Sequence, residues 1–145
     1  MRMLFHHFKC KNLEKGLRKE LNLQDGPIMR KDLTRITELD LMSQQIRDLS
    51  GLHVMTQLTK LLLSGNQISD ISALRGVSQL KKLWLGGNDI SDISALKGMT
   101  QLNKLSLKQN QISDISALKG MTQLTDLGLY YNQISDISVL KDMTQ

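Results

Sequence analysis

The fifteen residues NQISDISALKGMTQL, at positions 110–124, decide the fold because the chain carries them in four nearly identical copies. The copy at 88–102 differs at one position, the copy at 66–80 differs at three, and a further copy begins at residue 132. Similarity at a fixed period indicates a repeat architecture, in which each unit adopts the same local structure and packs on its neighbours.

Aligning the leucines divides most of the chain into five units of 22 residues: 36–57, 58–79, 80–101, 102–123 and 124–145. Their shared frame, L-x-x-L-x-L-x-x-N-x-I-x-x-I-x-x-L, is the signature of leucine-rich repeats, in which a strand is followed by a short helical or extended return. Strand alternation predicts that the apolar positions of each unit point inward. In the second unit these are Leu58, Leu61, Leu63, Ile68, Ile71 and Leu74. One coil cannot bury such a set alone, whereas stacked coils form a continuous core.

The last four units place an asparagine where the chain leaves the strand: Asn66, Asn88, Asn110 and Asn132. An amide at a bend can donate to and accept from backbone groups that sheet pairing leaves unpaired. Stacking of the coils therefore predicts a structural asparagine ladder. The first unit has Gln44 instead, and its longer side chain is expected to satisfy these groups less well.

An aspartate recurs at one position of every ISDIS tract: Asp70, Asp92, Asp114 and Asp136. This column could be interpreted as a calcium-binding stack, but one carboxylate per unit is too sparse for the roughly six to eight oxygen ligands that calcium takes. We favour local capping and solubility on the outer face, with Ser72 as the cap of a helical turn at 73–75.

Residues 1–35 break the period and are predicted to form an N-terminal helical cap. Leu13, Leu17 and Leu21 recur every four residues between basic side chains, the pattern of an amphipathic helix. The sequence DGPI predicts a turn at 25–28, and a second short helix is expected through Asp32 and Leu33. A helix with a leucine face can cover the open end of a repeat array. Residues 1–8 are expected to fray.

The net charge of +5 belongs to this cap, because residues 1–35 hold nine Lys or Arg and four Asp or Glu, and the rest holds ten of each. An anionic partner is one interpretation. We favour a solvated helix of mixed charge and expect no nucleic-acid partner. The sequence has no run of 18 apolar residues, so no membrane span is predicted. The lone Cys10 excludes an internal disulfide, and MRMLFHHFKC is unlike a signal peptide.

The stretch NLEKGLRKELNLQDGPIMRKDLTRITELDL at 12–41, followed by QQIRDLSGL at 44–52, resembles the cap and first repeat of bacterial internalin-like leucine-rich-repeat proteins. The unit with NQISDIS is similar to that family too, and the resemblance spans roughly residues 8–145. It implies an α/β solenoid, a right-handed curved superhelix whose parallel concave sheet binds a protein ligand, often on a secreted or wall-anchored chain. Members carry a signal peptide and a C-terminal cap, so we expect a fragment, a truncated reading frame or an incomplete gene model.

Function is expected where the units differ, because the fold requires the same of every unit. The return is nearly invariant, whereas the strand tracts read TKLLLSG, KKLWLGG, NKLSLKQ and TDLGLYY. Their outward positions fall on the concave face and include the only Trp and both Tyr of the chain. The predicted ligand-binding residues are Lys60, Leu62, Lys82, Trp84, Lys104, Ser106, Lys108, Asp126, Tyr130 and Tyr131.

Trp84 is predicted to lie between Leu62 and Ser106 in an exposed apolar patch, beside a row of three lysines. Trp and Tyr are enriched among interface hot spots, and a basic row favours an acidic partner surface. Drift on a tolerant surface is the alternative interpretation. His6, His7 and Cys10 have no acid or second base placed near them, so no metal site, cofactor or nucleophile is predicted, and the protein is expected not to be an enzyme.

The leading prediction is a protein-recognition module of the internalin-like class. An intracellular regulatory scaffold is the second hypothesis. The third is a structural fragment that self-associates end to end through an uncapped C-terminal coil, where Leu127, Leu129, Ile134 and Ile137 are expected to be uncovered. Met55, Met99, Met121 and Met143 recur at one repeat position and are expected at the edge of the core.

Overall fold

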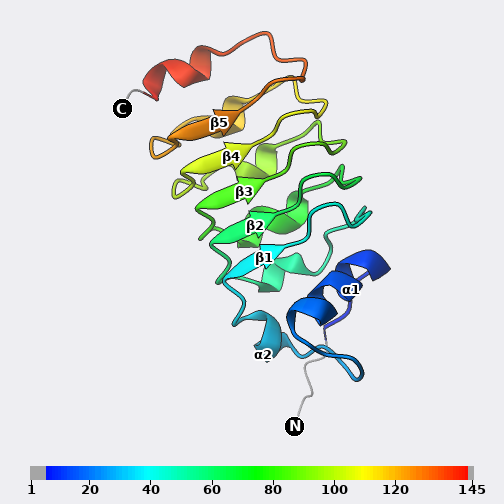
Figure 1. Cartoon of the computed structure of the whole chain (residues 1–145). Coiled ribbons are helices and arrows are strands. Elements are labelled where there is room, and N and C mark those ends of the chain that lie inside the picture. The colour runs from blue at the N-terminus through cyan, green and yellow to red at the C-terminus, as the bar shows by residue number, and fades with distance from the viewer. Residues whose placement is uncertain (1–5, 144–145) are drawn as a thin grey trace.

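The computed structural model, which describes residues 6–143, shows a solenoid of stacked coils with one short strand in each coil (Figure 1). The strands are β1 Glu38–Asp40, β2 Lys60–Leu62, β3 Lys82–Trp84, β4 Lys104–Ser106 and β5 Asp126–Gly128. They form one sheet in sequence order, and every neighbouring pair is parallel. Leu61 pairs with Leu83, one repeat length later, so the predicted solenoid and its register are confirmed.

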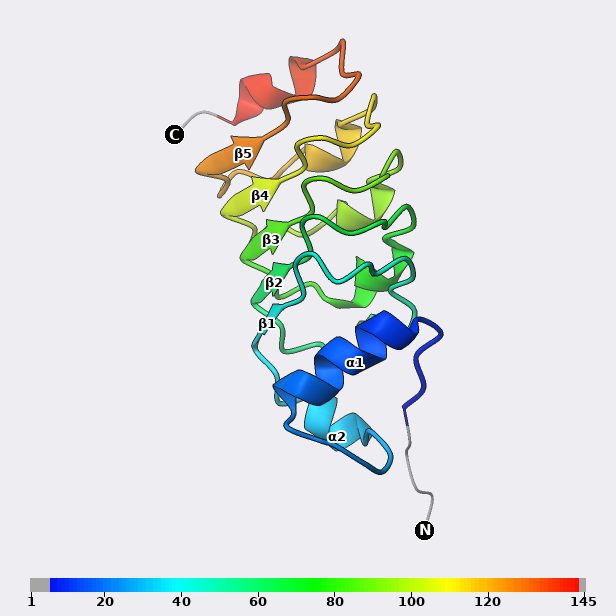
Figure 2. The same cartoon turned by 45° about the vertical axis from the view of Figure 1, so that its right-hand side comes forward.

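Each strand is followed by a bend and by a return that contains a 3₁₀ turn, on the side of the coil opposite the sheet (Figure 2). These turns are η1 Leu52–Val54, η2 Ser72–Gly76, η3 Ser94–Leu96, η4 Ser116–Leu118 and η5 Ser138–Asp142. Hydrogen bonds between coils continue past the strands: Leu63 N donates to Trp84 O at 2.8 Å, and Gln67 N donates to Ile46 O at 2.9 Å. Strand and bend are therefore both held by the neighbouring coil.

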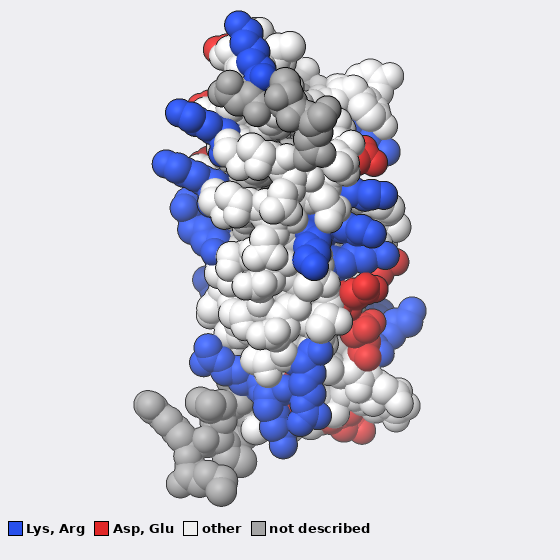
Figure 3. Space-filling model, turned by 90° about the vertical axis from the view of Figure 1, so that its left-hand side faces the viewer, with Lys and Arg blue, Asp and Glu red and all other residues white. Residues whose placement is uncertain are grey.

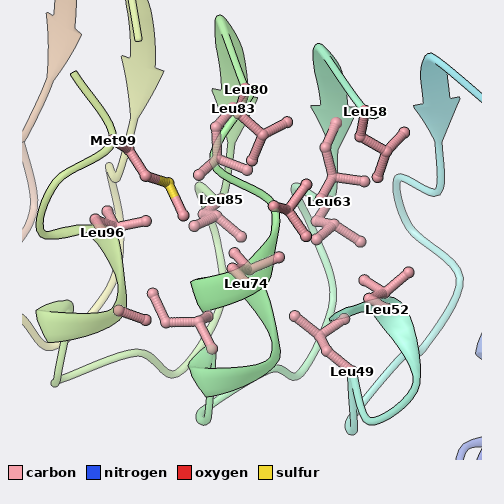
Figure 4. Close-up of a cluster of buried hydrophobic side chains, with 14 of the residues drawn as sticks. Leu49, Leu52, Leu58, Leu63, Leu74, Leu80, Leu83, Leu85, Leu96 and Met99 are labelled. Atoms are coloured by element: carbon pink, nitrogen blue, oxygen red, sulfur yellow. The ribbon is translucent and has the colours of Figure 1, made fainter. Parts of the chain in front are cut away.

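The core lies between the sheet and the turns and is aliphatic (Figure 4). Leucines from successive coils point into one shared space, as the periodicity predicts. Met55, Met99 and Met121 are fully buried members of this core. The expectation of an edge position is wrong for these three, because the flexible thioether chain fills space between coils that the second unit fills with Val77, whereas Met143 is only partly buried.

The N-terminal end is closed by α1 Lys11–Glu20 and α2 Arg30–Leu33 (Figures 1 and 2). Leu13 and Leu17 of α1 are completely buried. Gly16 lies between them, at a point where a Cβ would collide with the side chain of Leu41. The helix therefore packs with its backbone close against the first coil.

His6 and Phe8 contact the cap and the first coil, and residues 1–5 lie outside the described chain, so fraying of residues 1–8 stays a prediction. His6 N donates to Ile28 O at 2.9 Å, and the His6 ring Nε2 lies 2.8 Å from Gly51 O. The Phe8 ring occupies the space where a Gly51 side chain would lie, about 2.6 Å from that Cβ position. Because Gly51 has no side chain, the Phe8 ring can pack directly on the backbone of the first coil.

The C-terminal coil is less covered than the others. Ile137 is 60% exposed, whereas Ile115, its equivalent one unit earlier, is 2% exposed. Leu127, Leu129 and Ile134 are only partly buried. Within residues 6–143 the chain leaves this coil with one apolar side open.

Candidate functional site

A ladder of asparagines fixes the bend that follows the strands. Asn88 Oδ1 accepts from Ile68 N at 3.0 Å, and its Nδ2 donates to Leu63 O at 3.1 Å and Leu85 O at 3.0 Å. Asn66, Asn110 and Asn132 make the corresponding bonds. Each amide therefore ties its own bend to the preceding coil, and the predicted ladder is present.

The first bend is satisfied by the second unit. Asn66 Oδ1 accepts from both Gln44 N and Ile46 N at 3.0 Å. The Gln44 side chain lies beside Gly16 of α1 instead, where it contacts the cap. Its longer amide therefore does not compete for the backbone groups of the bend.

The outer face is capped by the recurring aspartates. Asp70 Oδ1 accepts from Ser72 N at 2.8 Å, and Asp92, Asp114 and Asp136 make the same bond to the serine two residues later. These backbone bonds, together with bonds from the serine hydroxyls, hold the pKa of each of the four carboxyls below its ordinary value. The predicted role of Ser72 as the cap is wrong: its hydroxyl makes no cap bond, and the aspartate supplies the acceptor.

On the sheet face, the register places the outward residues of successive strands in columns. The first column, called here the charged row, holds Glu38, Lys60, Lys82, Lys104 and Asp126. The second column holds Asp40, Leu62, Trp84, Ser106 and Gly128. Neighbouring members of a column lie about 4.8 Å apart, because that is the strand spacing. The sequence predicted both columns correctly.

The charged row is basic in the middle and acidic at both ends. Figure 3 shows Lys and Arg side chains along both edges of this side of the molecule, and on the right-hand edge Asp and Glu side chains lie above and below them. Within residues 6–143 the ion pair found is Arg18 with Glu14, at 3.7 Å, which lies in α1. None of the five charges of the row is therefore engaged by another described side chain.

Trp84 is the exposed large hydrophobic residue of the second column, with 38% of its surface accessible. Leu62 on the neighbouring strand is only 8% exposed, so the prediction that it contributes an open apolar patch is wrong. It lies between Asp40 and Trp84 in the register of the sheet. Leu62 therefore supports the face instead of offering an anchor.

Beside Trp84 the face is hollowed, over about 410 Å³. The floor carries small residues, among them Ser106 and Gly128, and Trp84 and Tyr130 line the hollow. Lys104, Lys108 and Asp126 add charge to the lining. The hollow is open, polar at its rim and apolar on its walls, which suits a side chain of a partner better than a small molecule.

Lys108 is held in place at one side of the hollow. Its Nζ lies over the Tyr130 ring, 5.6 Å from the centroid, a cation–π geometry. Its aliphatic stem crosses Gly86, where a Cβ would come within about 2.8 Å of Lys108 Cγ. The Tyr130 and Tyr131 rings meet edge to face with centroids 5.3 Å apart. These residues form one aromatic and basic group.

Tyr131 carries a feature that sequence reasoning missed. The residue before each ladder asparagine has a left-handed backbone: φ is +74° at Gly65, +66° at Gly87, +55° at Gln109 and +58° at Tyr131. Two units meet this demand with glycine, whereas a large aromatic residue there costs conformational energy. Gly65 and Gly87 at this repeat position were the sequence signal that the backbone there is left-handed. Tyr131 is also 74% exposed, so the fold gains little from it.

The N-terminal histidine His6 lies against the first coil. The His6 ring donates from Nε2 to Gly51 O and lies 5.9 Å from the ring of His53, and burial lowers the pKa of His6. In the described part of the chain, no group of three or more His, Cys, Asp or Glu side chains is arranged to hold a metal ion. The same residues contain no helix of the length and apolarity that a membrane crossing requires.

Comparison with known proteins agrees with this geometry. Residues 56–98 and 100–142 match the family model described as leucine-rich repeats in two copies. A search of curated proteins finds no match. An internalin from Listeria monocytogenes, InlF, superimposes with a TM-score of 0.74 at 26% identity, over 94% of this chain and 48% of its own. The functional domain of InlJ from the same organism has a TM-score of 0.70 at 20% identity, over 93% of this chain and 39% of its own. The chain thus spans less than half the length of either of these two solved internalin chains.

Proposed function

The chain belongs to the leucine-rich repeat family, and from this premise we propose that it is an internalin-like recognition module that binds a protein ligand on its concave sheet. A protein-interaction role follows from the fold. What we propose in addition is that the ligand is a protein and that it binds on the concave sheet. The resemblance implies a secreted or cell-surface location. Absence of catalysis also stays a prediction.

One observation carries the proposal: the only Trp of the chain and Tyr130 line the hollow on the sheet side and are open to solvent, and the exposed Tyr131 packs against Tyr130 just beyond. Trp84 and Tyr130 line the same hollow, and Tyr130 is 56% exposed. Aromatic side chains of this kind bury large areas at low entropy cost, and they dominate interface energetics. No core contact requires them, because the equivalent positions in other units are Leu62, Ser64 and Ser106.

The ladder adds preorganisation. Each bend is tied to the preceding coil by an asparagine, so the sheet face presents its side chains on a fixed frame. A rigid face loses little conformational entropy when it binds, and more of the contact energy then appears as affinity. The three lysines of the charged row favour an acidic surface on the partner.

A displayed library of random peptides tests the face. We expect selected binders to lose most of their affinity for Trp84→Ala and for Gly128→Leu, which fills the hollow. A Cβ at Gly128 meets only ordinary contacts, at 3.5 Å from Ser106 Oγ, so this variant is expected to fold. The control is Gln111→Leu, an exposed position in the return. Binders that survive both face variants and fail on the control would refute the proposal.

A second candidate role is end-to-end association, favoured by the open C-terminal coil. Ile137, partly buried Leu127 and Leu129 offer an apolar surface that a second copy could cover. Light scattering across a concentration series should then show growth that Ile137→Asp abolishes. A monomer at every concentration would exclude this role.

A further inference from the structure

We infer that the concave face binds a short acidic segment of its partner, with carboxylates on Lys60, Lys82 and Lys104 and a neighbouring apolar side chain in the hollow beside Trp84. It rests on the proposed function, because it assigns the ligand chemistry of that same face. The sequence suggests an acidic partner in general terms. The structure adds the position at which the partner's carboxylates would bind, on three neighbouring strands, and the apolar hollow beside that position.

The three lysines present a compact array of positive charge. They occupy one column on consecutive strands, so the row spans roughly 10 Å at the strand spacing. Like charges at this spacing repel one another, and no described carboxylate pairs with any of them. Carboxylates of a partner would relieve this repulsion, which gives the row a preference for acid over neutral ligands.

The row also has acidic ends, which limit the ligand. Glu38 pairs in register with Lys60 on one side, and Asp126 pairs with Lys104 on the other. An anionic chain that ran beyond the three middle strands would meet a carboxylate at either end, and such like-charge contacts are unfavourable. A long polyanion such as DNA or a broad anionic membrane therefore fits the row less well than a short acidic segment of a protein.

Lys104 joins the charged row to the hollow, because it belongs to both. Next to it, Ser106 and Gly128 leave space on the floor, and Trp84 and Tyr130 line the space. Lys108 Nζ over the Tyr130 ring keeps that ring in place from the far side. An aliphatic side chain adjacent to the acidic residues would enter this space beside Lys104, against the rings of Trp84 and Tyr130.

The experiment uses the emission of Trp84, which reports on the hollow alone because it is the only Trp of the chain. The probe is the blocked peptide Gly-Gly-Leu-Glu-Glu-Glu-Gly-Gly, compared with its Gln counterpart at low salt. We expect the Glu peptide to shift the emission saturably and to bind about tenfold or more tightly than the Gln peptide. Replacing Lys60, Lys82 and Lys104 together by Gln should remove this preference.

One control matches the charge change, and one further variant tests an acidic end of the row. The triple Gln variant of Lys97, Lys119 and Lys141, in the returns, changes the net charge equally and should leave binding intact. Asp126→Asn removes one acidic end of the row and should strengthen binding of the Glu peptide about twofold or more.

Equal binding of the Glu and Gln peptides, or equal loss in both lysine triples, would overturn the inference. Single-stranded DNA or phosphatidylserine vesicles could also compete with the Glu peptide. If either displaces it at a concentration of negative charges lower than that of the peptide, the inference is overturned in favour of an extended polyanion. If library binders require Trp84 but are neutral and ignore the lysine triple, the inference fails while the proposed function stands.

Discussion

Asn88 and Trp84 lie four residues apart in one coil and represent two different regions of the molecule. Asn88 belongs to the return, is buried, and bonds backbone groups of two coils. Trp84 belongs to the strand tract, points outward, and has no counterpart in other units. The return repeats because every coil meets the same packing demand, whereas the strand tract varies because the fold constrains only its inward positions. Identity between units marks the fold, and difference marks the candidate site.

The largest effect is expected at the buried isoleucine of the return. Ile93→Ala should lower the free energy of unfolding by about 3 kcal/mol, because it removes buried methylenes and leaves a cavity. Ile137→Ala, at the same repeat position in the open coil, should cost less than about 1 kcal/mol. Urea unfolding followed by circular dichroism measures both. Equal costs would show that the open coil is covered in solution.

The ladder should contribute nearly as much. Asn88→Ala leaves Ile68 N without its acceptor, whereas Leu63 O and Leu85 O each keep one amide donor, from Asn66 and Asn110. The free energy of unfolding should therefore fall by about 2 kcal/mol. The control is Asp89→Ala, an exposed neighbour, which should change it by less than about 0.5 kcal/mol. Folded Asn88→Ala protein should bind selected peptides normally. A small stability loss would mean that water replaces the amide and that the ladder is not a structural support.

The outer aspartates should produce a modest acid dependence. Their folded-state pKa values lie below the ordinary value, so their contribution is present above the unfolded pKa of about 3.9. It is lost as the pH falls further, through the folded pKa. Replacing all four by Asn keeps an oxygen acceptor for each serine N–H but removes the titration. The thermal midpoint of that variant should fall less between pH 6 and pH 3 than that of the parent; an equal fall would assign the acid sensitivity elsewhere.

The smallest effect has opposite signs for stability and binding. Tyr131→Gly relieves a left-handed tyrosine and should raise the free energy of unfolding by about 0.5–1 kcal/mol. Gln109→Gly, at the same repeat position, should stabilise similarly. If Tyr131 serves the site, only its substitution weakens peptide binding. Unchanged binding in both variants would leave the exposed tyrosine as tolerated drift.

Much of the fold follows from the sequence because one frame repeats. The period gives the strand register, the inward leucines and the ladder, and a single spacing error would have moved Leu61 and Leu83 out of pairing. The columns of the candidate site follow from the same register, so Lys60, Lys82 and Lys104 were placed in a row correctly.

The misses concern features that a period does not encode. The repeat frame gives Leu62 and Trp84 the same outward position and does not encode their difference in exposure, and the hollow depends on the small residues Ser106 and Gly128 being next to large ones. The Asp70 cap depends on backbone angles of the turn, and a serine two residues later is an equally plausible cap in the sequence. The contact between Phe8 and Gly51 joins residues far apart in the chain, so no local sequence pattern predicts it.

The most direct test of this division between the two regions is a paired measurement on Trp84→Ala, with affinity for a library-selected peptide and urea unfolding determined on the same sample. We predict that affinity falls about tenfold or more while the free energy of unfolding changes by about 1 kcal/mol or less. Unchanged affinity would contradict the account. So would a loss of stability of about 3 kcal/mol, which would make Trp84 part of the folded core.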